Sequence, residues 1–250
     1  MIALQSGKRR HCRKEAPVKY YPIYLDIANK RCVVVGGGEV AERKTRRLLE
    51  CGARVVVVAK TLTPFLERKG NEGAIEHCAV DYEDSCLEGA FLVIGATDRD
   101  EVNGRISDDA GARGIPVNIV DDPARCDFIL PALFQREDLV IAVSTGGKSP
   151  ALAKKLREEL ERRYGPEYAV LLNILGDLRE TVVAKGLPSA ENKQLFEAIV
   201  NSDVLQALRE GNWGRVSEII LRITGLHIGP EHFTADGITG HKGKRRKREG

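Results

Sequence analysis

The sequence lacks any long apolar run. No stretch approaches the ~20 consecutive apolar residues that a membrane-spanning helix needs, and residues 1–19 lack the apolar core of a signal peptide. We therefore expect a soluble chain that works in the cytoplasm. Its 250 residues, 42% of them hydrophobic, are enough for one domain with an extension or for two small domains.

The sequence also lacks any C-x-x-C pair. Its cysteines are scattered, and most fall within strand or helix patterns, which favours reduced buried thiols over disulfides or a zinc site. There are six of them: Cys12, Cys32, Cys51, Cys78, Cys86 and Cys126. We expect no resident metal ion.

Basic residues are scarce in the body of the chain, although the net charge is +3. Residues 1–19 and residues 241–250 each hold six Lys or Arg and one Glu, so acidic residues outnumber basic ones between these ends by 34 to 27. The run at residues 242–248 is short and has no aromatic residue, a pattern that favours a disordered solubilising end over a nucleic-acid site. We expect no nucleic-acid partner.

The most informative stretch is residues 33–41, where an apolar β-branched run stops at three glycines and a helical pattern begins. Gly36, Gly38 and Ala41 have the spacing of a dinucleotide loop, in which the glycines permit the turn and the approach of phosphate, and the alanine permits close packing of the helix on the strand. The free N–H groups at the helix start would face the anion. A second strand pattern at residues 54–59 completes the unit. This context predicts a nucleotide site. The cations of the helix, at residues 43, 44, 46 and 47, could form a solvated face or a basic rim, and we expect the solvated face.

Three further strands are predicted at residues 75–80, 91–96 and 115–120, and they alternate with helical patterns. The alternation predicts an α/β fold with a doubly wound parallel sheet of the Rossmann type, in which ligands bind at the carboxyl ends of the strands. We expect the residues at these ends to share one rim; they are Gly36, Gly37, Gly38, Lys60, Thr97, Asp98, Asn118 and Asp121.

The end of the second strand departs from the usual dinucleotide pattern. An acidic residue normally grips the adenosine ribose at this position, whereas here Ala59 is followed by Lys60. Lys60 could attract the 2′-phosphate of NADP, or it could lie beside the adenine. The residues therefore leave the choice between NAD and NADP open. Just beyond, Thr63 and Pro64 are typical of the start of a helix.

Beyond residue 123 the pattern changes. Residues 128–132 and 139–143 are typical of two antiparallel strands joined by polar residues 135–138. The loop at residues 144–150 then places Ser149 as the N-cap and Pro150 at the start of a long helix. Its hydroxyls, backbone N–H groups and Lys148 could hold an anion, or the loop could serve only as a cap. From Pro166 the chain is predicted to be wholly helical, with Ser189 capping one of the helices.

Five motifs, taken in order, resemble the precorrin-2 dehydrogenase family, which includes the N-terminal module of siroheme synthase and stand-alone dehydrogenase/ferrochelatases. They lie at residues 35–44, 96–98, 118–121, 128–132 and 142–150. The resemblance runs from about residue 21 to about residue 221. No methyltransferase domain follows, so we expect the stand-alone form.

The resemblance implies NAD-dependent oxidation of precorrin-2 to sirohydrochlorin in siroheme biosynthesis, carried out by a homodimer. It matches Asp121 to the catalytic aspartate of the family. The predicted cofactor contacts are Gly36, Gly37, Gly38, Glu39, Val40, Lys60, Thr61, Thr97 and Asp98. The substrate is rich in carboxylates and needs cations and N–H donors; the predicted substrate contacts are Asn118, Arg125, Ser144, Thr145, Gly146 and Lys148.

Together, patterns and resemblance predict five segments. They are a basic N-terminal extension (1–19), an NAD-binding Rossmann domain (20–122), a small α+β dimerisation region (123–165), an all-helical domain (166–228) and a basic tail (229–250).

The predicted chemistry needs a single base, because oxidation of the macrocycle sends a hydride to the cofactor and releases a proton. Iron insertion stays open as a second activity, since the family contains members that only oxidise. Two other classes of function compete with this interpretation. One is a nucleotide-sensing regulatory module with a helical output region, and the other is a chelatase for which NAD is incidental.

Overall fold

The computed structural model describes residues 19–184, 186 and 188–229, which divide into two compact units between Leu130 and Pro131. The predicted basic extension and basic tail lie almost wholly outside the described residues. The finer division at residues 122/123 and 165/166 stays a prediction. Each unit is described by itself below.

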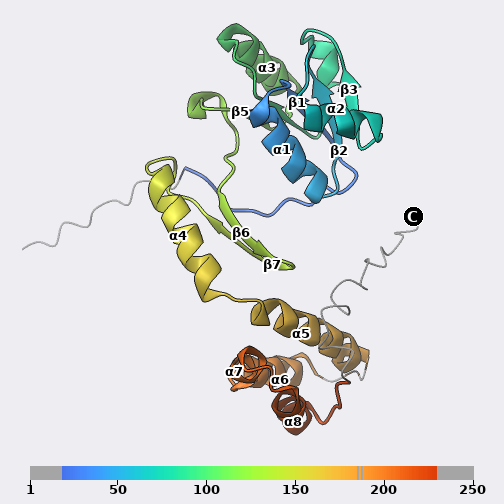
Figure 1. Ribbon diagram of the computed structural model, residues 1–250, viewed down its shortest axis with the longest axis vertical. Helices are drawn as coiled ribbons and strands as arrows, with labels where there is room; N and C mark the ends of the chain where they lie inside the picture. Colours follow the sequence, from blue (N-terminus) through green and yellow to red (C-terminus); the bar gives the residue numbers. More distant parts are fainter. Residues whose placement is uncertain (1–18, 185, 187, 230–250) are drawn as a thin grey trace, which may run out of the picture. The chain divides into compact units, whose positions relative to one another are not determined.

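The first unit is built on a five-stranded parallel sheet in the order β3-β2-β1-β4-β5, as Figure 1 shows. The strands are β1 (Arg31–Val35), β2 (Arg54–Val58), β3 (Ile75–Cys78), β4 (Leu92–Gly95) and β5 (Val117–Ile119). In the register of the sheet, Val35 lies opposite both Val58 and Gly95. This is the predicted Rossmann-type sheet, and it brings the carboxyl ends of β1, β2 and β4 together.

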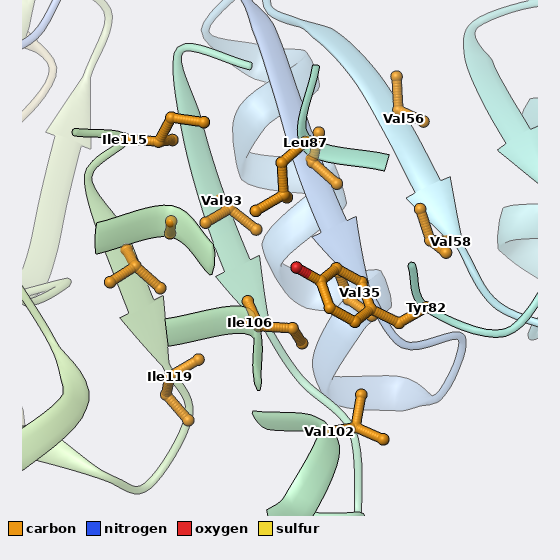
Figure 2. Close-up of a cluster of buried hydrophobic side chains, with 13 residues drawn as sticks. Val35, Val56, Val58, Tyr82, Leu87, Val93, Val102, Ile106, Ile115 and Ile119 are labelled. Atoms are coloured by element: carbon orange, nitrogen blue, oxygen red, sulfur yellow. The ribbon is translucent and has the colours of Figure 1, made fainter. Parts of the chain in front are cut away.

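Helices cover both faces of this sheet, which is why its three central strands, β1, β2 and β4, are nearly continuous apolar runs. The covering elements are α1 (Glu39–Glu50), α2 (Pro64–Asn71), the 3-10 turn η1 (Asp84–Leu87) and α3 (Asp100–Arg113). Successive residues of β1 serve opposite faces: Val34 packs with residues of α1 and α2, whereas Val33 and Val35 pack with residues of η1 and α3. Figure 2 shows the second of these layers, in which Leu87 and Ile106 are fully buried.

The second unit begins with a hairpin of β6 (Ala132–Arg136) and β7 (Leu139–Val143), which pair antiparallel. The strand predicted at residues 128–132 is therefore wrong, because the pairing strand starts only at Ala132. Glu137 adopts φ 51°, the left-handed conformation that a two-residue hairpin turn demands at its first position. With Arg136 opposite Leu139, two of the four polar residues predicted as a loop, Gln135 and Arg136, belong to the strand, and the other two form the turn. Phe134 is buried. The segment before Pro131 is tied to β5 instead.

Five helices complete the second unit: α4 (Pro150–Arg163), α5 (Glu167–Ala184), α6 (Ser189–Val200), α7 (Val204–Arg209) and α8 (Trp213–Thr224). The last four share a core in which Ile174, Ile199 and Ile219 are fully buried. Within the described ranges, none of the helices has the length and apolar content to pass through a bilayer.

The predicted helix starts are confirmed at two positions and wrong at a third. Thr63 accepts a hydrogen bond from the Leu66 N–H, and Ser149 accepts one from the Leu152 N–H at 3.2 Å. Ser189, however, is the first helical residue of α6, and Pro188 precedes it as the N-cap. Pro188, with ψ 143°, is the last residue with extended backbone, so the helix begins one residue earlier than the Ser189 prediction requires.

Candidate functional site

A cleft of about 790 Å³ lies at the carboxyl ends of β1, β2, β4 and β5, wholly within the first unit. Its wall contains the predicted base Asp121 and seven of the nine predicted cofactor residues: Gly37, Gly38, Glu39, Val40, Thr61, Thr97 and Asp98. Gly36 and Lys60 do not line the cleft, although each adjoins a residue that does. The prediction that these strand ends share one rim is thus confirmed for the residues in the wall.

The three glycines between β1 and α1 have different structural tasks. Gly36 has φ 127°, and a side chain there would overlap the carbonyl oxygen of Ala96. A Cβ on Gly37 would overlap the carbonyl oxygen of Thr61 and lie 2.9 Å from the Ala59 Cβ. At Gly38 no atom lies within 4 Å of the Cβ position. The chain itself therefore requires the first two glycines, whereas Gly38 leaves open space.

That open space lies at the N-terminus of α1. Gly38 is the N-cap and has no side chain to accept hydrogen bonds from the first turn. The N–H groups of Glu39 and Val40, which line the cleft, are thus available to an anion, and the helix dipole favours negative charge there. The cradle fits the pyrophosphate of a dinucleotide.

The loop after β2 is fastened to the glycine loop by Thr63. Its N–H donates to the carbonyl oxygen of Gly37 at 3.0 Å, and its hydroxyl donates to Glu42 of α1 at 2.5 Å. This hydrogen bond, followed by that from Arg46, holds the pKa of the Glu42 carboxyl below its usual value. Sequence reasoning missed Glu42, because its partner lies 21 residues away.

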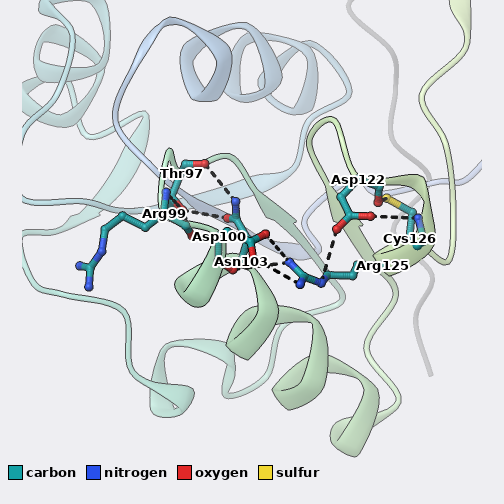
Figure 3. Close-up of polar contacts among 8 residues, drawn as sticks. Thr97, Arg99, Asp100, Asn103, Asp122, Arg125 and Cys126 are labelled. Carbon is teal, nitrogen blue, oxygen red and sulfur yellow. Dashed lines mark hydrogen bonds and ion pairs between the residues drawn. The ribbon is translucent and has the colours of Figure 1, made fainter.

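Asn103 holds Thr97, which lines the cleft, by two hydrogen bonds that Figure 3 shows. Its amide nitrogen donates to the Thr97 carbonyl oxygen at 3.0 Å, and its amide oxygen accepts from the Thr97 hydroxyl at 2.8 Å. Asn103 is only 8% exposed, on the same face of α3 as Ile106 and Ala110. Sequence reasoning missed it, although a polar residue on a helix's apolar stripe was the available signal.

Asp121 follows β5 with φ 63°, a left-handed conformation that Asp tolerates better than most residues. Its exposed side chain belongs to the cleft wall. Lys44 of α1 interacts with it electrostatically. Burial and the neighbouring Arg43 lower the pKa of Lys44, and the negative charge of Asp121 opposes that shift.

Lys44 is thus half-buried, and its predicted place on a solvated face is wrong. The reason is that Lys44 lies on the side of α1 that faces Asp121, the residue that follows β5. Among the described residues Lys44 forms no hydrogen bond and no ion pair within 4 Å. Its charge therefore acts on Asp121 through space.

Two of the predicted substrate residues hold the segment after Asp121 in place. Arg125 lies 2.7 Å from an oxygen of Asp100 at the start of α3 and 3.4 Å from one of Asp122, as Figure 3 shows. The Asn118 amide is buried and donates to the carbonyl oxygen of Phe128 at 2.9 Å. Both residues order the chain beside the cleft, and their predicted contacts with substrate stay predictions.

The other predicted substrate residues lie in the second unit, in the loop between β7 and α4. The Thr145 hydroxyl donates to the carbonyl oxygen of Ser149 at 3.0 Å, and the Ser144 hydroxyl accepts from the Gly146 N–H at 3.1 Å. Gly146 adopts φ 61°, and Lys148 is exposed. The loop is closed by its own hydroxyls, so its predicted role toward substrate stays a prediction.

The described cysteines are free thiols, and burial raises the pKa of Cys32 to about 11. In the part of the chain that the structure describes, no group of three or more His, Cys, Asp or Glu side chains is placed to hold a metal ion.

Comparison with known proteins matches the chain in two parts. Residues 23–132 match a family model described as "Putative NAD(P)-binding", and residues 136–163 match one described as "Sirohaem biosynthesis protein central". The first match contains every residue of the cleft wall.

Siroheme synthase 1 of Aeromonas salmonicida is 41% identical over 201 residues, which are 80% of this chain and 43% of that protein. The siroheme synthase of Methylobacillus flagellatus is 36% identical over 220 residues, which are 86% of this chain and 47% of that protein. The chain thus spans less than half the length of these curated relatives. A solved precorrin-2 dehydrogenase shares the fold with a TM-score of 0.70 and 24% identity, over 83% of this chain and all of that one.

The nucleotide cradle, the two family models in sequence and the relatives that span both agree with one another. The chain is thus similar to the siroheme synthases over about four fifths of its length and shares the fold of a precorrin-2 dehydrogenase.

Proposed function

We propose that the chain oxidises precorrin-2 to sirohydrochlorin in siroheme biosynthesis, with NAD⁺ as the hydride acceptor. One observation carries the proposal: Asp121 and the glycine loop, far apart in the sequence, are walls of the same cleft. A carboxylate beside a dinucleotide cradle is the minimum that a hydride-transferring dehydrogenase of this kind requires.

NAD⁺ supplies the hydride-accepting chemistry when it is bound. In our proposal Gly37, Gly38, Glu39 and Val40 hold its pyrophosphate with backbone N–H groups, and Thr61, Thr97 and Asp98 line the rest of its path. Gly36 supports the turn from behind, through the close approach of its backbone to Ala96. Lys60 lies at the adenosine end.

Asp121 accepts the proton that the tetrapyrrole loses as its hydride leaves. The reaction removes one hydride and one proton from precorrin-2, so a single base completes the balance. Lys44 of α1 lies close enough to Asp121 for the charges of the two side chains to interact. The ordered segment held by Asn118 and Arg125 keeps the carboxylate in the cleft wall.

The carboxylates of the substrate require cations and hydrogen-bond donors. We assign this task to Asn118, Arg125, Ser144, Thr145, Gly146 and Lys148. In our proposal Arg125 contacts substrate while it keeps its ion pairs with Asp100 and Asp122, because a guanidinium group has five N–H donors.

We also propose that the chain is a cytoplasmic homodimer. Leu152 and Leu156 support this, because they lie one turn apart on α4 and are 47% and 37% exposed. Sedimentation equilibrium of the purified chain tests the proposal, and a monomer at micromolar concentration would contradict it.

Anaerobic incubation of the purified chain with precorrin-2 and NAD⁺ tests the proposed activity. We expect NADH and sirohydrochlorin to form in equal amounts. A chain that binds NAD⁺ without any turnover would favour the sensing module. Metal insertion into sirohydrochlorin without NAD⁺, and without any oxidation, would favour the chelatase.

A further inference from the structure

The loop after β3 places a carboxylate, that of Asp81, beside Lys60. Lys60 is the residue for which the sequence left the choice between NAD and NADP open. An oxygen of Asp81 lies 2.7 Å from the Lys60 ammonium nitrogen, and its other oxygen lies 3.9 Å from an Arg99 guanidinium nitrogen. Lys60 follows β2, and Arg99 immediately precedes α3. Three separate loops thus bring two cations and one anion together.

This cluster, Lys60, Asp81 and Arg99, lies beside the cleft. Ala59 and Thr61, on either side of Lys60, line the cleft, as does Asp98 next to Arg99. The end of β2 is where a Rossmann fold meets the adenosine ribose, whose 2′ position distinguishes NAD from NADP. Figure 3 shows the Arg99 side chain extending away from Asp100 and Arg125, which form an ion pair at the start of α3.

The cluster contributes little to stability, because its three side chains are 62–65% exposed. Its consequence is for a ligand. Lys60 and Arg99 alone would form a phosphate site of the kind that selects NADP. The Asp81 carboxylate lies against both cations and takes the place that the 2′-phosphate of NADP would occupy as their anionic partner. The hydrogen bond from Lys60 and the charges of both cations hold the pKa of Asp81 below its usual value, so it stays ionised at neutral pH.

We propose that Asp81 determines the choice of dinucleotide: its carboxylate engages Lys60 and Arg99, repels a 2′-phosphate, and makes the chain prefer NAD to NADP. The carboxylate that a Rossmann fold usually places at the end of β2 is supplied here from the end of β3. This inference rests on the proposed cofactor site and adds the residue that selects among its ligands.

The test is the dissociation constants of NAD⁺ and NADP⁺ for the full chain, measured by isothermal titration calorimetry without tetrapyrrole. We expect the wild type to bind NAD⁺ more tightly. Asp81→Asn should tighten NADP⁺ binding by about tenfold or more and change NAD⁺ binding by less than about threefold. The gain should vanish when Lys60→Met is added, because the phosphate then loses a partner.

Asp84→Asn is the matched control. Asp84 is as exposed as Asp81, at 62%, and its oxygen pairs with Arg113 at 2.6 Å, so its loss changes the net charge by the same amount without freeing Lys60 or Arg99. Both dissociation constants should stay at their wild-type values. An Asp81→Asn variant with unchanged selectivity, or an equal gain in Asp84→Asn, would overturn the inference and leave the proposed function standing. A wild type that prefers NADP⁺ would overturn the inference and also the choice of NAD⁺ in the proposed function. A wild type that binds neither dinucleotide would overturn both.

Discussion

The glycine loop offers a paired test, because Gly37 and Gly38 differ in what surrounds them. Ala at position 37 places a methyl group against the Thr61 carbonyl and the Ala59 side chain, and two of these contacts are with backbone that cannot rotate away. Ala at position 38 meets no atom within 4 Å. The first substitution should damage the fold, and the second should damage only the approach of a ligand.

The magnitude follows from the contacts. Overpacking of this kind costs about 1–3 kcal/mol. The hydrogen bond from the Thr63 N–H to the Gly37 oxygen, 3.0 Å long, must shift as well, which adds about 1 kcal/mol. We therefore expect Gly37→Ala to lower the free energy of unfolding by about 2–4 kcal/mol. Gly38→Ala should change it by less than about 1 kcal/mol, because Gly and Ala differ modestly at an N-cap.

Urea unfolding and NAD⁺ titration separate the two effects. Gly38→Ala should unfold close to the wild-type urea midpoint, yet bind NAD⁺ at least about tenfold more weakly, because its methyl group occupies space beside the pyrophosphate. Gly37→Ala should lose stability first. The reasoning is refuted if Gly37→Ala is as stable as the wild type, or if Gly38→Ala binds NAD⁺ normally.

Three further predictions follow from the same geometry. Lys44→Met should lower kcat about tenfold with NAD⁺ affinity unchanged, whereas Lys44→Arg keeps most of the rate; equal rates in steady-state assays of both variants would contradict the role of its charge. Asn103→Ala should cost about 1–3 kcal/mol in urea unfolding and weaken NAD⁺ binding, since it leaves the Thr97 carbonyl without its partner; a stable variant would count against this. The pKa of the Cys32 thiol is raised to about 11 in the folded chain, so the unfolded chain loses the thiol proton at a lower pH. The contribution of the neutral thiol to the free energy of unfolding is therefore complete below about pH 9 and is lost as the pH rises to about 11. Cys32→Ala should flatten the fall in unfolding free energy across that window, and an unchanged slope would contradict it.

The fold could be predicted because burial on both faces of the sheet makes its central strands nearly continuous apolar runs. Residues 54–58 and 92–95 are visible for this reason, and the strand ends then locate the cleft. The hairpin of the second unit was harder to predict. Its strand at residues 132–136 ends in polar residues, and only one residue of the strand, Phe134, is buried. A one-sided strand beside an apolar run at 128–130 gives an ambiguous pattern.

The residues that sequence reasoning missed act through tertiary contacts. Glu42 accepts a hydrogen bond from Thr63, Asn103 accepts one from Thr97, and Asp81 forms an ion pair with Lys60. Where the two partners come from different elements, no local sequence pattern indicates the contact. The glycines were visible because three of them in a row between a strand and a helix form a motif in the chain, although Ala96 and Thr61 are the residues that constrain Gly36 and Gly37. Lys44 looked like its three basic neighbours, and only the direction of α1 distinguishes it.

The most direct test of the central claim is the Asp121→Asn variant, assayed for both precorrin-2 oxidation and NAD⁺ affinity. Asn suits the left-handed backbone at this position, where φ is 63°, so the substitution removes the base without straining the turn. We predict a loss of oxidation of at least about a hundredfold, with the dissociation constant of NAD⁺ within about threefold of the wild-type value. Oxidation at the wild-type rate would contradict the assignment of the base, and a loss of NAD⁺ binding would show that Asp121 serves the cofactor site instead.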